Sequence, residues 1–159
     1  MVKLLLIGIL LLQFSYAKDI TFSEKRYIYA IDNEFSKNGK LFMEPQRVVL
    51  EYPQTHKKVI YTKDFIQISD EEKTESFTHE ENHQYKLFFT LVIAIYNNDL
   101  EQLQENFEIK KNKEEVTLLP KEQIVSVIKK ISFEKTKERL KYLTIYFQNQ
   151  DRITIEQTN

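Results

Sequence analysis

One stretch decides the fold: Lys86-Leu87-Phe88-Phe89-Thr90-Leu91-Val92-Ile93-Ala94-Ile95-Tyr96, residues 86–96, is almost wholly apolar. A run of this kind is compatible with a buried strand or with a buried helix. Its length and the polar Asn97-Asn98-Asp99 that follow it favour a helix. Because the helix would be apolar on every face, it must be covered on all sides by the rest of the protein.

The sequence on both sides of this stretch is typical of short β-strands. Apolar and β-branched residues gather in runs at 27–31, 41–43, 48–52, 59–61, 65–68, 107–109, 116–119, 131–133, 140–147 and 152–156. Asn38-Gly39 lies between two of these runs and predicts a hairpin turn, since both residues tolerate positive φ. Residues 70–83 are strongly polar and predict a solvated connection.

Strands at hairpin spacing around one apolar helix indicate an α+β protein that is mostly β, with an antiparallel sheet curled around the helix. We expect one domain, residues 18–159, because the sequence has no internal repeat and no change in composition that would mark a domain boundary.

The first residues predict a cleavable signal peptide, residues 1–17. Lys3 supplies the positive charge, Leu4 to Leu12 form an apolar block, and Ser15 and Ala17 are the small residues before a cut after Ala17. The block is shorter than the roughly 20 residues of a membrane-spanning helix, although an uncleaved anchor is the alternative. We therefore expect export to the periplasm, without a lipid anchor because the chain has no cysteine.

Composition excludes several classes of function. Acidic and basic residues nearly balance, 24 against 23, which gives no reason to expect a nucleic-acid partner. The chain has two glycines, Gly8 and Gly39, too few for a phosphate-binding loop. Without cysteine or a G-x-S-x-G motif, nothing indicates a nucleophilic enzyme. The sequence predicts no enzyme activity and no cofactor.

One motif, in contrast, is typical of an enzyme. His79-Glu80-Glu81-Asn82-His83 matches H-E-x-x-H, in which two histidines one helical turn apart bind zinc and the glutamate activates water. The working motif lies in a core helix, whereas the residues around this one are polar, and the extended form with a third histidine is absent. We expect no metal site, and a zinc-dependent hydrolase using His79, Glu80 and His83 stays as the minor alternative.

The remaining candidate for a functional site is the apolar surface of the protein. With 11 Phe and 9 Tyr, the chain either packs its aromatic residues into a filled core or lines a cavity for an apolar ligand. A filled core would suit a structural or interaction protein of the cell envelope.

The order of elements resembles the periplasmic outer-membrane lipoprotein carrier family, LolA, over roughly residues 22–155. The resemblance is carried by residues 22–28, 39–43 and 45–53, then by the apolar helix, and then by residues 107–109 and 116–121. It implies an incomplete antiparallel barrel, a half-barrel, wrapped around a helical lid. The chain departs from the family in having Glu44 where a basic residue is common and in lacking a long N-terminal helix.

The resemblance also implies a function and a site. The protein would be a monomeric lipid-binding chaperone that shields the acyl chains of lipoproteins, between an inner-membrane donor complex and an outer-membrane acceptor. Carried over residue by residue, the implied cavity is formed by Leu41, Met43, Val48, Leu50 and Tyr52. The implied lid contributes Phe88, Leu91, Val92 and Ile95, which share one helical face at i, i+3, i+4 and i+7.

Overall fold

The structure is a computed structural model that describes residues 17–159. The predicted signal peptide, residues 1–17, therefore lies outside the described residues apart from Ala17. Among the described helices, none is both long and apolar enough to cross a membrane.

One sheet contains all the strands of the described chain, eleven in number, in the order β6-β5-β4-β3-β2-β1-β11-β10-β9-β8-β7. Neighbouring strands are antiparallel throughout. The strands are β1 (Lys18–Ile28), β2 (Asn33–Glu44), β3 (Arg47–Tyr52), β4 (Lys57–Thr62), β5 (Ile66–Ser69), β6 (Thr74–Phe77), β7 (Phe107–Asn112), β8 (Glu115–Pro120), β9 (Ile128–Lys135), β10 (Leu140–Phe147) and β11 (Arg152–Gln157).

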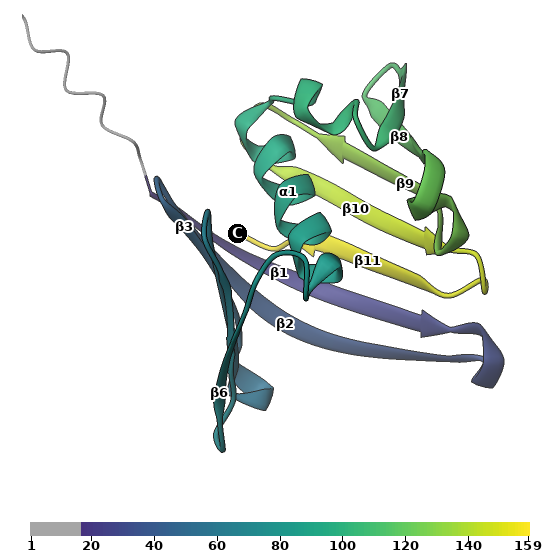
Figure 1. Cartoon of the computed structure of the whole chain (residues 1–159). Coiled ribbons are helices and arrows are strands. Elements are labelled where there is room, and N and C mark those ends of the chain that lie inside the picture. Colours follow the sequence, from purple (N-terminus) through teal and green to yellow (C-terminus); the bar gives the residue numbers. More distant parts are fainter. Residues whose placement is uncertain (1–16) are drawn as a thin grey trace, which may run out of the picture.

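The sheet is strongly curved, and it is open because β6 and β7 are its two unpaired edges (Figure 1). The chain crosses from one edge to the other through helix α1 (His83–Asn97), which lies on the concave side of the sheet (Figure 1). Short 3-10 turns complete the fold: η1 (Tyr29–Ile31), η2 (Pro53–Thr55), η3 (Glu101–Leu103) and η4 (Glu122–Ser126). The prediction of a mostly β protein, with an antiparallel sheet curled around one apolar helix, is confirmed.

Helix α1 begins and ends at asparagines. The Asn82 side chain accepts a hydrogen bond from the Tyr85 amide at 3.4 Å, which satisfies one of the free N–H groups of the first turn. Asn98 adopts a left-handed conformation with φ 55° and ends the helix. Between them, Phe89, Leu91, Val92, Ala94, Ile95 and Tyr96 are buried. The prediction that residues 86–96 are helical is therefore confirmed.

The predicted hairpin turn at Asn38-Gly39 is wrong. Both residues lie in the middle of β2, and Gly39 pairs directly with Phe22 of β1. The chain turns instead at η1, where Asp32 takes the left-handed conformation (φ 46°) and its carboxylate accepts a hydrogen bond from the Tyr27 hydroxyl at 2.8 Å. Tertiary packing of the Phe22 ring over Gly39 outweighs the local turn preference.

The polar stretch at residues 70–83 is also more ordered than predicted. Its middle forms β6, which pairs with β5 from Ile66↔Phe77 to Ser69↔Thr74. This strand is polar because it lies at the edge of the sheet, where polar and charged residues are typical.

Candidate functional site

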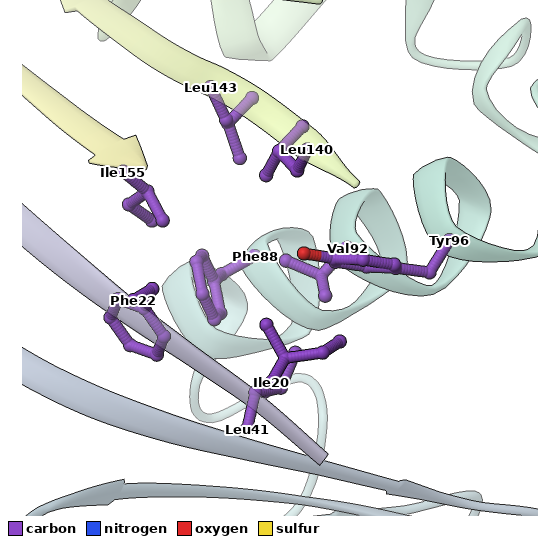
Figure 2. Close-up of a pocket in the computed structure, with 9 residues that line it drawn as sticks. All are labelled: Ile20, Phe22, Leu41, Phe88, Val92, Tyr96, Leu140, Leu143 and Ile155. Atoms are coloured by element: carbon purple, nitrogen blue, oxygen red, sulfur yellow. The ribbon is translucent and has the colours of Figure 1, made fainter. Parts of the chain in front are cut away.

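A small apolar cavity lies between α1 and the concave face of the sheet, with a volume of about 20 Å³. Figure 2 shows its lining, in which residues of α1 face residues of β1, β2, β10 and β11. The lining residues are Ile20, Phe22, Leu41, Phe88, Val92, Tyr96, Leu140, Leu143 and Ile155.

The cavity is far smaller than an acyl chain requires. A volume of this size is enough for about one water molecule, whereas small-molecule pockets have volumes of roughly 300 to 1,000 Å³. The apolar side chains of α1 therefore fill most of the space under the curved sheet. Phe88 is the one α1 residue of the lining that stays partly exposed, since Val92 and Tyr96 are both buried.

The structure brings all nine residues of the implied site into one continuous apolar core. Only three of them, Leu41, Phe88 and Val92, line the cavity itself. The others lie in the core around it: Met43, Val48, Leu50, Tyr52, Leu91 and Ile95.

Sequence reasoning missed six lining residues. Ile20 and Phe22 come from β1, Tyr96 from the last turn of α1, and Leu140, Leu143 and Ile155 from the two strands that end the chain. The alternation of apolar residues at positions 20 and 22 is a signal that could have found the first two. The residues of β10 and β11 join the site only because β11 pairs with β1.

A polar cluster lies at one end of the apolar lining, next to Phe22. The ring of Phe22 meets the ring of Tyr52 edge-to-face, with centroids 6.0 Å apart. The Tyr52 hydroxyl donates a hydrogen bond to the buried Glu24 carboxylate at 2.5 Å, and the Lys37 ammonium lies 3.2 Å from that carboxylate. Burial and the nearby Glu24 charge raise the pKa of Tyr52 well above its usual value. The Tyr52 ring therefore packs in the apolar core, while its hydroxyl is hydrogen-bonded to Glu24.

A second polar region lies at the other end, around Tyr96. The Tyr96 hydroxyl lies 3.1 Å from the side-chain oxygen of Gln157 and donates a hydrogen bond to it. The Lys18 ammonium donates to the Tyr96 carbonyl at 3.1 Å, and the Lys135 ammonium donates to the Ile95 carbonyl at 3.0 Å. Cations at a helix C-terminus are favourable because they face its free carbonyls. Burial raises the pKa of Tyr96.

The H-E-x-x-H motif does not lie on one helix. His79 and Glu80 are in a turn, Asn82 is the N-cap, and His83 is the first residue of α1. The His79 ring stacks on Tyr61, with centroids 4.9 Å apart, and its Nε2 lies 2.9 Å from the Thr62 carbonyl oxygen. The motif therefore lacks the helical geometry that places two histidines on one metal. Among the described residues, no group of three or more His, Cys, Asp or Glu side chains could hold a metal ion.

No protein-family model matches the chain, and no curated protein sequence matches it either.

Proposed function

We propose that the protein is a lipid-binding carrier with a half-barrel of the LolA kind, in which α1 is the lid over a site for acyl chains. Its cargo would be an acylated lipoprotein or another lipid, which it carries through the periplasm from an inner-membrane donor to an outer-membrane acceptor. The proposal needs no catalytic residue and no cofactor.

The observation that carries the proposal is the position of α1. The helix joins the two edges of an open sheet and lies across its apolar concave face (Figure 1). Apart from the polar contacts at its C-terminal end, its contacts with the sheet are apolar side chains, which an acyl chain can replace without leaving a buried polar group unpaired. Each CH₂ group removed from water contributes about 0.8 kcal/mol, so one acyl chain can offset the loss of several helix contacts.

Binding requires α1 to move, because a cavity of about 20 Å³ does not accommodate an acyl chain. The helix is joined to β6 and β7 by irregular segments, residues 78–82 and 98–106, apart from the short turn η3. In this structure, α1 itself occupies the site. Cargo release would follow when a partner offers a better apolar surface and α1 returns.

Native mass spectrometry of protein purified without detergent tests this proposal. We expect lipid bound at one molecule per chain, or reversible binding of a fluorescent fatty acid at that ratio. If the protein carries no lipid and binds no displaceable probe, the carrier proposal is wrong.

The small cavity favours a second candidate, an envelope interaction protein with a filled core. In that case α1 is a permanent part of the core. The same measurement separates the two, since a filled core binds no acyl probe.

A further inference from the structure

A second hollow adjoins the C-terminal end of α1, and it is polar. Its volume is about 300 Å³, within the range of small-molecule sites. Its lining combines the start of β1, the last turn of α1, the end of β9 with the segment after it, and the end of β11: Lys18, Asp19, Ile20, Tyr96, Lys135, Lys137, Glu138 and Gln157.

This polar groove shares two lining residues, Ile20 and Tyr96, with the apolar cavity. Tyr96 lies between the two spaces, with its ring in the lining of the cavity (Figure 2). The Lys18 and Lys135 ammonium groups lie 5.9 and 5.7 Å from the centroid of that ring. Once α1 has moved to admit an acyl chain, as the proposed carrier function requires, the polar end of that molecule can extend past Tyr96 and lie among the lysines.

The charges of the groove favour an anion. Three lysines face two carboxylates, those of Asp19 and Glu138. Lys18 and Lys135 donate hydrogen bonds to carbonyl oxygens at the end of α1, whereas Lys137 makes no hydrogen bond or ion pair within residues 17–159. Burial and, to a lesser degree, the neighbouring Lys18 charge lower the pKa of Lys135.

We propose that this groove binds the singly negative head group of an acyl ligand whose chain lies in the apolar cavity under α1. The inference rests on the proposed carrier function and adds to it the chemistry of the ligand's polar end. An excess of one lysine over the carboxylates suits one negative charge, that of a carboxylate or a phosphodiester. Lys137 supplies the free ammonium group, and Lys18 and Lys135 supply the surrounding positive field.

Two matched pairs of ligands test the charge preference in the purified protein. Palmitate is compared with methyl palmitate, and lysophosphatidylglycerol with lysophosphatidylcholine of the same chain length, by displacement of a fluorescent fatty-acid probe. We expect at least one charged member to bind about threefold or more tighter than its partner, as for partly exposed ion pairs. The pair that gives the preference identifies the head group as a carboxylate or a phosphodiester.

The variant Lys137→Glu tests the site. It should weaken binding of the preferred anion about threefold or more and leave the uncharged or zwitterionic partner unchanged. Lys129→Glu is the matched control, because Lys129 is exposed, lies near the start of β9 and makes the same change in net charge. Thermal melting should show that both variants remain folded.

The possible outcomes separate this inference from the function on which it rests. If all four ligands bind, with no charge preference and no effect of Lys137→Glu, the head-group site is wrong and the carrier stands. If none binds, the carrier proposal fails and the head-group site fails with it. If Lys137→Glu and Lys129→Glu weaken binding of the preferred anion equally, the effect comes from net charge alone, and the proposal of a head-group site is wrong.

Discussion

The ring of Phe22 lies on the backbone of Gly39, its direct cross-strand partner, in the space that a β-carbon at residue 39 would occupy. Gly39 is buried in the middle of β2 and the ring belongs to the cavity lining. The glycine is therefore required by a close approach of a side chain and not by a turn.

Gly39→Ala is expected to destabilise the protein by about 1–3 kcal/mol, because its methyl group forces the buried Phe22 ring to shift. Urea denaturation measures the change in the free energy of unfolding. Asn38→Ala, at an exposed position of the same strand, is the control. Replacing Phe22 by leucine in the Gly39→Ala background should recover part of the loss, and an unchanged stability in Gly39→Ala would contradict this packing.

Phe88→Glu should abolish or strongly weaken acyl binding, since it places an unpaired carboxylate in an apolar cavity lining. Phe88 is partly exposed, so the variant can fold with its carboxylate toward solvent. Val125→Glu makes the same kind of change at a residue that is 49% exposed and outside the cavity. Circular dichroism and melting establish folding, and fluorescent fatty-acid titration measures binding. Full binding by a folded Phe88→Glu variant would refute a site under α1.

Tyr52→Phe tests the polar cluster at the end of the lining. It leaves the buried Glu24 carboxylate without its hydroxyl donor, so we expect a loss of about 1–3 kcal/mol at pH 7. Urea denaturation of the variant and of the unaltered protein measures the loss. Tyr29→Phe, in the exposed turn η1, is the control and should change little.

The contact between Tyr52 and Glu24 also predicts that the free energy of unfolding depends on pH. The pKa of Tyr52 is raised by burial and by Glu24 above its unfolded value of 10.0. Above that pH the unfolded chain loses the phenolic proton while the folded chain keeps it, so this group lowers stability as pH rises. The unaltered protein should lose up to about 1.4 kcal/mol per pH unit from this group, and Tyr52→Phe should not. The stability gap between them should therefore narrow from pH 9 to 11; a constant gap would argue against the raised pKa.

Glu80→Gln separates the carrier from the hydrolase alternative. Glu80 is exposed in a turn, so the substitution should leave acyl binding unchanged and stability within about 0.5 kcal/mol. His79→Ala should cost more, because it removes the ring stack on Tyr61 and the contact with the Thr62 carbonyl. If Glu80→Gln removes a function that a folded Phe88→Glu variant keeps, the hydrolase interpretation replaces the carrier.

The predicted signal peptide is tested by intact mass. Protein recovered after export should have the mass of a chain that begins at Lys18, since Ser15 and Ala17 provide the small residues before the cut. A mass that includes residues 1–17 would contradict processing and favour the uncleaved anchor.

Local sequence predicts most elements of this fold because their patterns agree with their tertiary surroundings. Residues 48–52 and 59–61 form strands as expected, and the long apolar run forms α1. The prediction fails at Gly39, where the partner that matters is Phe22, seventeen positions away in the sequence. It also fails at β6, whose mostly polar residues join the sheet by pairing with the backbone of β5.

The site was less predictable than the fold for the same reason. Leu41, Phe88 and Val92 lie at the cavity, and each belongs to an element with a clear local pattern. Leu140, Leu143 and Ile155 reach it through a pairing between the first and last strands. A pattern of apolar residues within a short stretch of sequence does not show that these two distant strands pair.

The place of β1 in the sheet also bears on the order of folding. Of the strand pairings, β1 with β11 alone joins distant parts of the sequence, from Phe22↔Gln157 to Tyr27↔Arg152. Hairpins on either side can form locally, but the concave surface is complete only when the last residues of the chain are present. Contacts between such distant residues slow folding, because a large loop must close before they form. A chain delivered to its compartment N-terminus first would therefore remain without a finished core until its final strand arrives.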